Sequence, residues 1–328
     1  MKAISAILSF LPAALAVSSA PSGCITVAKS GGNYATIQAA VNSLSTTSTA
    51  AQCIFIKAGT YKEQVLVSAR SAQLTIYGAT TTDSTYKSNT VTISSGLSQA
   101  DGLSNDATGT LRVKATGFRL YNVDVENTYG EGSQAVALSA YADSGYYGSS
   151  FIGFQDTVLS NTGKQIYVGC KIEGATDFIF GQVAYSWFER VDIRVLGRKI
   201  GYVTANGPTA AGNSYYVFNK CDIAAADGET VPTGAYYLGR PWREYAKVVF
   251  QYTSMSSVIN SAGWSIWNTG DPRTGSVLFG EYQNNGSGAS GTRATFATKL
   301  SSPILIKDIL GSSYASQPYF DSDYYNGA

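Results

Sequence analysis

Two stretches of the chain repeat one another: Ser149-Ser150-Phe151-Ile152-Gly153-Phe154-Gln155-Asp156 and, 21 residues further on, Cys170-Lys171-Ile172-Glu173-Gly174-Ala175-Thr176-Asp177. Looser copies of the pattern occupy residues 121–125, 189–193 and 219–223. Each copy joins β-branched or aromatic residues to a polar turn. Repeats of this kind, about 20 to 30 residues apart, predict an all-β solenoid whose coils bury their inner faces by stacking.

Most of the remaining chain consists of short apolar or alternating runs, which are typical of strands. They cover residues 53–56, 74–77, 111–113, 118–125, 135–138, 166–168, 191–195 and 248–252. Hairpin turns of the Asn-Gly type are scarce between them, which disfavours a β-sandwich but leaves it as the alternative fold. Helical spacing of Ile37, Val41 and Leu44 predicts a short N-terminal helix over residues 36–45 that caps the open end of the solenoid.

Composition limits the chemistry, because the 328 residues include no histidine and 23 Lys and Arg balance 22 Asp and Glu. The missing histidine excludes catalytic triads with a histidine base and HExxH zinc sites. The charge balance gives no indication of nucleic-acid binding. The usual spacings of metal ligands are absent from the sequence, so we expect no metal and no cofactor.

The N-terminus has the pattern of a secretory signal peptide, predicted over residues 1–17, and a single domain is predicted over residues 18–328. Lys2 gives a positive start, residues 3–15 are mostly apolar, and Ala14-Leu15-Ala16 suits cleavage after Ala16 or a few residues later. The segment is shorter than the roughly 20 apolar residues of a membrane span, and a buried N-terminal helix is the alternative. The sequence therefore predicts a secreted, extracellular protein without a membrane segment.

Four cysteines follow this segment, and an even number suits an oxidising compartment. They are Cys24, Cys53, Cys170 and Cys221. Three pairings are possible, of which proximity in the sequence favours Cys24 with Cys53. Asn285-Gly286-Ser287 forms a sequon for N-glycosylation.

Stacking of the coils places two acidic residues close together, since neighbouring parallel strands lie about 4.8 Å apart. The 21-residue offset puts Asp156 and Asp177 one above the other, and the same offset puts Gln134 next to Gln155. Two carboxylates about 5 Å apart repel by roughly 3 kcal/mol, or about two pKa units, at an effective dielectric near 20. We expect one to stay protonated and the other to be charged, as an acid catalyst and a nucleophile require.

The segment Leu238-Gly239-Arg240-Pro241-Trp242 supplies further candidates. The Arg240 guanidinium could pair with a carboxylate at two points and fix its orientation. Trp242, Phe178 and several tyrosines offer flat apolar faces for a sugar ring. Each residue also has a structural interpretation: a turn aspartate, a glutamine ladder, an ion pair or ordinary packing. The joint arrangement favours a catalytic site, because adjacent like charges are costly.

Five ordered blocks resemble the signature segments of pectin methylesterases. They are Gly59-Thr60-Tyr61-Lys62-Glu63, Gln134-Ala135-Val136-Ala137-Leu138, Gly153-Phe154-Gln155-Asp156-Thr157-Val158, Asp177-Phe178-Ile179-Phe180-Gly181 and Leu238-Gly239-Arg240-Pro241-Trp242. The similarity runs from residues 31–38 to residues 280–286, and the chain resembles the secreted microbial, fungal-type form. Val158 stands where the motif commonly has leucine, a mild departure.

This resemblance implies a right-handed parallel β-helix that removes methyl esters from homogalacturonan, giving pectate and methanol. It implies that Asp177 is the nucleophile and that Asp156 is the proton donor and acceptor. Gln134 and Gln155 would stabilise the oxyanion, Arg240 would orient Asp177, and Trp242 would contact the substrate, together with Gln134 and Arg240. The expected partner is pectin, bound by a monomer without any cofactor.

Two other functions suit a similar solenoid. A polyuronide glycosidase or lyase could also use closely spaced carboxylates, and a non-catalytic carbohydrate-binding solenoid could use the aromatic residues alone. The first would release reducing ends or unsaturated products, and the second would release nothing. Methanol release from pectin therefore separates both from the esterase.

Overall fold

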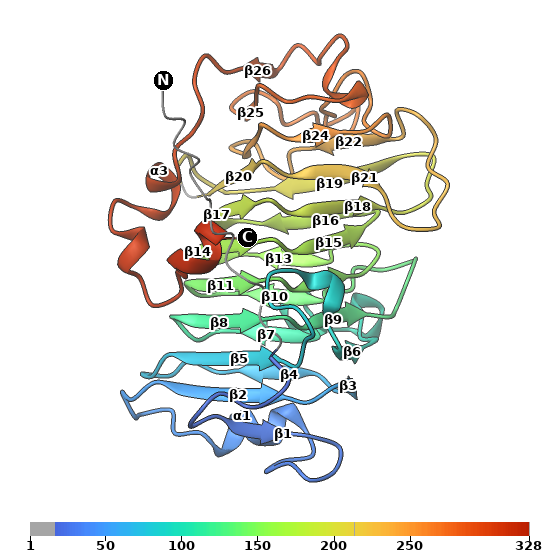
Figure 1. Ribbon diagram of the computed structural model, residues 1–328. Coiled ribbons are helices and arrows are strands. Elements are labelled where there is room, and N and C mark those ends of the chain that lie inside the picture. The colour runs from blue at the N-terminus through green and yellow to red at the C-terminus, as the bar shows by residue number, and fades with distance from the viewer. Residues whose placement is uncertain (1–16, 213, 328) are drawn as a thin grey trace, which may run out of the picture.

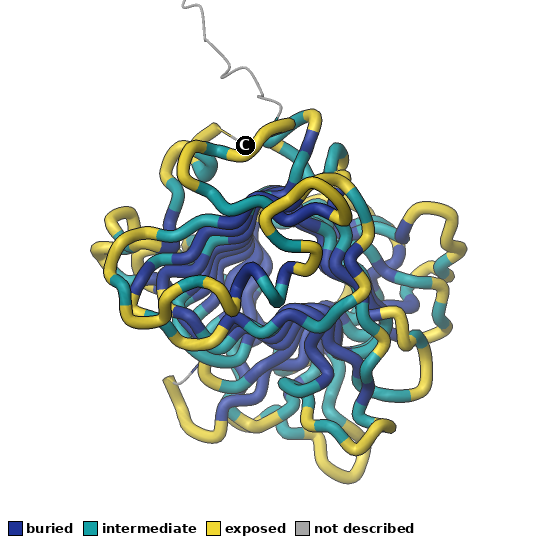
Figure 2. Tube along the Cα trace, turned by 90° about the horizontal axis from the view of Figure 1, so that it is seen from below, coloured by how far each residue is buried: buried dark blue, intermediate teal, exposed yellow. Residues whose placement is uncertain are grey.

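The computed structural model describes residues 17–212 and 214–327, and its strands form three sheets that wind about one axis (Figure 1). All pairings between the named strands are parallel. The fold is therefore the predicted parallel β-helix, and the β-sandwich alternative is wrong. Seen from below, the buried segments of successive coils overlie one another and the exposed segments form outer loops (Figure 2).

The elements have the following bounds. The eleven-stranded sheet contains β1 (Ile25–Val27), β2 (Gln52–Ile56), β5 (Leu74–Gly78), β8 (Phe118–Tyr121), β11 (Ser144–Tyr147), β14 (Thr162–Val168), β17 (Val183–Glu189), β20 (Tyr215–Asn219), β23 (Lys247–Gln251), β25 (Leu278–Tyr282) and β26 (Ala297–Lys299). The seven-stranded sheet contains β4 (Val65–Val67), β7 (Leu111–Val113), β10 (Leu138–Ala140), β13 (Val158–Ser160), β16 (Thr176–Gly181), β19 (Gly201–Asn206) and β22 (Tyr236–Gly239). The eight-stranded sheet contains β3 (Gly59–Lys62), β6 (Val91–Ser95), β9 (Asp124–Asn127), β12 (Ser150–Ile152), β15 (Lys171–Gly174), β18 (Asp192–Val195), β21 (Asp222–Ala225) and β24 (Ser254–Met255). The α-helices are α1 (Ile37–Ser43), α2 (Asn105–Thr108), α3 (Ile306–Leu310) and α4 (Ser322–Gly327).

The register between coils follows the sequence repeat. Phe151 pairs with Ile172, an offset of 21 residues, and Val158 pairs with Ile179 at the same offset. Inside the coils, aromatic rings stack with neighbouring centroids 4.3–4.8 Å apart. The stack consists of Tyr146, Tyr167, Phe188, Phe218 and Phe250. Such offset-stacked rings add to the burial energy of the core.

Helix α1 covers the N-terminal end of the β-helix, as predicted, although it ends one residue before Leu44. The Thr36 hydroxyl accepts a hydrogen bond from the Ala39 amide and begins the helix. The Glu63 carboxylate accepts hydrogen bonds from the amides of Ile37 and Gln38, at 2.8 and 2.9 Å. A carboxylate at this position satisfies free amides and complements the helix dipole. The motif at residues 59–63 therefore has a structural role here.

The C-terminal tail, residues 301–327, lies along the outer side of the eleven-stranded sheet, where α3 packs against β14 and β17 (Figure 1). It binds coils that are far apart along the axis. The contacts include Gln73 donating to the Pro318 carbonyl, Tyr147 to Tyr319, Arg190 to Tyr325 and Gln251 to Ile304. The tail thus joins early coils to late ones.

The predicted pairing of Cys24 with Cys53 is confirmed. Cys170 and Cys221 are buried free thiols that each donate to backbone carbonyls. Residues 1–16 of the predicted signal peptide lie outside the described residues, whereas Val17 forms an antiparallel bridge with Thr80. Within residues 17–212 and 214–327, no helix is long and apolar enough to cross a membrane.

Candidate active site

The two predicted catalytic carboxylates lie on adjacent coils of the seven-stranded sheet. Asp156 lies two residues before the start of β13, and Asp177 lies in β16. Gln155 forms a parallel bridge with Thr176, and the Asp156 amide donates to the Thr176 carbonyl at 3.1 Å. This register places Asp156 and Asp177 side by side, as the repeat predicts. The side chains are almost completely enclosed, since the residues are 6% and 7% exposed.

Both aspartates have left-handed backbone conformations, with φ of 65° at Asp156 and 50° at Asp177. This region is uncommon for residues other than glycine, although aspartate and asparagine enter it more easily. Backbone strain of this kind is frequent at functional sites. It also limits the substitutions that the two positions tolerate.

Arg240 holds Asp177 at two points. Its Nε donates to Oδ1 at 2.9 Å and its Nη2 donates to Oδ2 at 2.7 Å. The backbone fixes the arginine from the other side, because the Arg240 amide donates to the Thr204 carbonyl at 3.0 Å. A bidentate pair of this geometry orients a carboxylate as well as neutralising it. The predicted link between residues 177 and 240 is present in the structure.

The surroundings give the two carboxyl groups different affinities for a proton. Burial raises the pKa of Asp156 well above its usual range, and the charge of Asp177 raises it further, against a smaller lowering by Arg240. Burial also raises the pKa of Asp177, although hydrogen bonds and charge from Arg240 oppose that rise. Only Asp177 has a guanidinium bonded to it. The shared proton therefore belongs on Asp156, and the negative charge belongs on Asp177.

This arrangement predicts that Asp156→Asn stabilises the fold above neutral pH. The folded chain binds the Asp156 proton more tightly than the unfolded chain, so stability is lost as the pH rises through the raised pKa. An amide does not ionise, and we expect the free energy of unfolding at pH 8 to increase by about 1–2 kcal/mol. Urea denaturation at pH 8 and pH 4 measures the gain, which should shrink at pH 4.

Asp177→Asn is the matched comparison, because it removes a carboxylate that is paired. Arg240 then loses its partner, and breaking a partly buried ion pair from one side destabilises a protein. We therefore expect this variant to be less stable than the parent. Equal losses of stability in both variants would contradict the assignment of the proton to Asp156.

Gln134 and Gln155 also come from adjacent coils. The Ala135 amide donates to the Gln155 carbonyl at 3.1 Å, so the two glutamines precede neighbouring strands at the same edge of the sheet. Both residues are half-buried. Because Leu138 pairs with Val158, the offset here is 20 residues and not the predicted 21, so Ala135 is level with Gln155 and Gln134 lies one residue before it. The roles of the two side chains stay predictions.

Of the two predicted aromatic contacts with substrate, the one at Trp242 stays a prediction and the one at Phe178 is wrong. Trp242 is half-buried and lies beside Phe180, with ring centroids 6.0 Å apart. Phe178 is fully buried in the main core, so the prediction that it contacts substrate is wrong. The left-handed turn at Asp177 interrupts the alternation of side chains and shifts the register between residues 176 and 179. Phe178 faces inward, as alternation from Asp177 requires, but Ile179 also lies in the main core, so Phe180 faces outward and packs with Trp242.

Two aromatic rings that the sequence did not indicate enclose the Arg240 guanidinium. The guanidinium carbon lies 4.0 Å from the centroid of Tyr202 and 4.4 Å from that of Trp267. The guanidinium carbon of Arg273 also lies near Trp267, 4.9 Å from its ring centroid, and Arg273 donates a hydrogen bond to the Trp242 carbonyl. Cation–π contacts of this kind hold a guanidinium in a fixed plane. Neither Tyr202 nor Trp267 belongs to a repeat, so periodicity gave no signal for them.

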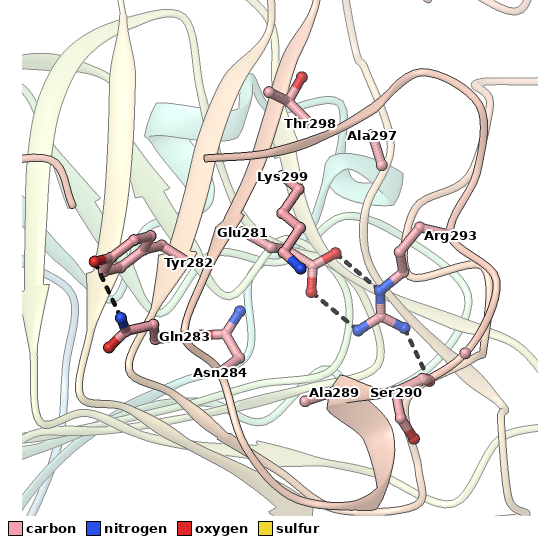
Figure 3. Close-up of a pocket in the computed structure, with 11 residues that line it drawn as sticks. Glu281, Tyr282, Gln283, Asn284, Ala289, Ser290, Arg293, Ala297, Thr298 and Lys299 are labelled. Carbon is pink, nitrogen blue, oxygen red and sulfur yellow. Dashed lines mark hydrogen bonds and ion pairs between the residues drawn. The ribbon is translucent and has the colours of Figure 1, made fainter. Parts of the chain in front are cut away.

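A pocket of about 570 Å³ lies elsewhere, at the C-terminal end of the β-helix (Figure 3). Arg293 forms a bidentate pair with Glu281 in it, with both distances at 2.9 Å, and Lys299 lines its wall. It contains none of the predicted site residues, and its ion pair ties the last loops to β25. In the part of the chain that the structure describes, no cluster of three or more His, Cys, Asp or Glu residues could hold a metal ion.

Comparison with known proteins agrees with this geometry. The chain matches the Pectinesterase family over residues 24–301. It is 52% identical to a pectinesterase of Aspergillus aculeatus, covering 99% of this chain and 100% of the relative, and 51% identical to one of Aspergillus niger over the same shares.

Solved structures give the same result. A pectin methylesterase of Aspergillus niger superimposes with a TM-score of 0.87 at 41% identity, covering 94% of this chain and 100% of that chain. The carrot pectin methylesterase gives a TM-score of 0.76 at 28% identity, covering 94% and 95%. The fold is thus the right-handed parallel β-helix of these enzymes. On its sequence, its fold and the position of its paired aspartates, the chain belongs to the pectinesterase family.

Proposed function

We propose that this carboxylic ester hydrolase removes methyl groups from the C6 esters of homogalacturonan and releases pectate and methanol. The observation that carries the proposal is the pair of buried aspartates, of which one is fixed at two points by Arg240. Such a pair supplies a nucleophile and an acid within one small site. Pectin is the proposed partner, and a monomer is the proposed working form.

In the first step the Asp177 carboxylate attacks the ester carbonyl carbon. The carbonyl oxygen becomes negative, and side-chain amides of Gln134 and Gln155 donate hydrogen bonds to it; one such donor is worth about 3 kcal/mol. Asp156 then gives its proton to the methoxy oxygen as the C–O bond breaks. Methanol leaves, and the galacturonate acyl group remains joined to Asp177 as an anhydride.

In the second step Asp156, now ionised, accepts a proton from water. The resulting hydroxide attacks the acyl carbon of the anhydride, and the bond to the Asp177 oxygen breaks. Galacturonate is released as a free acid, Asp177 recovers its charge, and Asp156 keeps the proton for the next cycle. The Arg240 guanidinium supports both steps by holding the reacting oxygen in place, and Trp242 offers its face to the sugar ring.

A methanol assay tests the proposal. Purified chain is incubated with highly methylated pectin, and methanol, reducing ends and unsaturated products are measured in the same samples. We expect methanol alone. Reducing ends would indicate a glycosidase, unsaturated products a lyase, and binding without any product a carbohydrate-binding solenoid; family membership favours none of these alternatives.

We also propose that the chain is secreted after removal of an N-terminal signal peptide. The bridge between Val17 and Thr80 supports cleavage after Ala16, because it includes Val17 in the folded domain. The disulfide between Cys24 and Cys53 suits an oxidising compartment. Asn285 is exposed, which supports its use as a glycosylation site.

A further inference from the structure

The turns that follow three late strands of the eleven-stranded sheet form a column on the outside of the β-helix. Strands β20, β23 and β25 pair in register up to their last residues. The residues that follow them are Lys220, Tyr252 and Gln283, all exposed and all with left-handed backbones, at φ of 55°, 53° and 46°. This turn column therefore presents a cation, a phenol ring and an amide at spacings of about 4.8 Å.

A groove of about 400 Å³, here called the tail groove, lies between the start of the turn column and the C-terminal tail. Lys220 and Tyr252 line its sheet side, and Lys307 of α3 lines its tail side. The Lys220 side chain is 59% exposed, and the acid paired with it, Glu189, lies 4.0 Å away. Lys307 is exposed and forms no ion pair within residues 17–212 and 214–327.

Glu189 leaves the charge of Lys220 available, because its own carboxylate is buried and already has closer partners. It accepts hydrogen bonds from Trp187 at 2.8 Å, Arg190 at 2.9 Å and Asn219 at 2.7 Å. A buried carboxylate that is paired in this way gains little from a fourth cation at the surface. The ammonium of Lys220 can therefore bind an anion in the tail groove.

The other end of the turn column opens into the pocket of about 570 Å³ at the C-terminal end of the β-helix, here called the end pocket. Tyr282 and Gln283 lie on one side of it and Arg293 lies on the other (Figure 3). An ion pair balances the charge of Arg293, whereas the exposed Lys299 has none in the part of the chain that the structure describes. Tyr252 connects the tail groove to the end pocket, because its ring meets that of Tyr282 with centroids 5.4 Å apart.

We propose that the tail groove, the turn column and the end pocket together bind a run of galacturonate units whose carboxylates are free. Lys220, Lys307 and Lys299 pair with carboxylates. The ring of Tyr252 packs against a sugar ring, and the amide of Gln283 bonds to hydroxyl groups. A methylated run lacks the charges that the lysines bind. This inference rests on the proposed function, because pectate is the product of that reaction.

This surface is distinct from the catalytic site. In the coil of Asp177, the four-residue strand β15 lies between the turn at Gly169 and the aspartate. Four residues at about 3.3 Å each span about 13 Å. A long pectin chain can therefore occupy both places, and binding at one raises the effective concentration of the chain at the other. The enzyme is then held on stretches that it has already converted.

Titration calorimetry with a short oligogalacturonate counts the binding sites. We expect the double variant Lys220→Gln with Lys307→Gln to bind one oligomer fewer per chain than the parent. With long, half-methylated pectin its KM should rise about three- to tenfold at unchanged kcat. With a short methylated oligomer, which cannot reach both places, kcat and KM should match the parent and show that the variant is folded. Lys220→Arg with Lys307→Arg keeps both charges and should bind as the parent does.

Lys57→Gln with Lys62→Gln is the matched control, because it removes two exposed lysines at the N-terminal end of the β-helix, after β2 and in β3. This control should keep the parental number of sites and the parental KM. The inference is overturned if the Lys220 and Lys307 variant binds as many oligomers as the parent, or if the control raises KM equally, which would indicate general charge attraction. Calorimetry needs no turnover, so these outcomes are distinct from a failure of the parent to release methanol.

Discussion

Replacing Asp177 by asparagine should lower the rate of methanol release from methylated pectin by at least about 10³-fold. Asparagine has the shape of aspartate but lacks the charge that attacks the ester carbon. It also enters the left-handed region at φ near 50°, so the backbone can keep its conformation. The rate should be measured as methanol released by purified protein under saturating pectin.

Loss of activity has to be separated from loss of structure. Circular dichroism should show that the Asp177→Asn variant is folded, and a binding assay should show that it still binds pectin. Asp222→Asn is the matched control, since Asp222 also pairs with an arginine, Arg194, on the eight-stranded sheet. That variant should retain the parental rate. A fully active Asp177→Asn enzyme would end the assignment of the nucleophile.

Arg240→Lys should reduce kcat by about 10²-fold, because small displacements of a reacting group have effects of that size. Lysine keeps the positive charge but cannot hold both Asp177 oxygens in one plane. It also loses the planar contacts with Tyr202 and Trp267, at 4.0 and 4.4 Å in the parent. The measurement is kcat with its pH profile.

The fall of kcat at low pH distinguishes two effects of Arg240: its orientation of Asp177 and its positive charge beside Asp177. Ionised Asp177 is the active form, so the rate should fall as the pH is lowered through the pKa of Asp177. Arg240→Gln removes the group that opposes the rise of this pKa and should move the acid limb to higher pH, whereas Arg240→Lys should move it less. Arg293→Lys alters a similar bidentate pair with Glu281 and should leave kcat unchanged. Parental kcat in Arg240→Lys would make Arg240 a purely structural residue.

The sequence was sufficient to predict the stacking of coils and the meeting of the two aspartates. The reason is physical: in a solenoid, a residue and its equivalent one repeat later occupy neighbouring parallel strands. The offset between Gln155-Asp156 and Thr176-Asp177 therefore determines their contact without knowledge of any distant packing. The roles of Asp156, Asp177 and Arg240 follow from the family resemblance and stay predictions.

Other parts of the site depend on features that periodicity does not carry. Phe178 lies on the opposite face from Asp177, as alternation gives, but Ile179 also lies in the main core and Phe180 lies outside it, so a simple alternation of side chains fails after Phe178. Tyr202 reaches Arg240 from β19, whose spacing in the sequence from β16 and β22 differs from the 21-residue repeat, and Trp267 reaches it from a loop. The two free thiols at Cys170 and Cys221 show likewise that an even count of cysteines does not determine pairing.

The C-terminal tail has a consequence for how the molecule comes apart. Coils that touch only their neighbours can peel away one at a time from either end, because each holds only its own share of the stability. Residues 301–327 form hydrogen bonds with coils from that of Gln73 to that of Gln251, so the tail holds these coils together. A coil between these two residues therefore cannot unfold without first releasing its contacts with the tail, whereas β1, β2, β25 and β26 lie beyond the coils that these two hydrogen bonds reach.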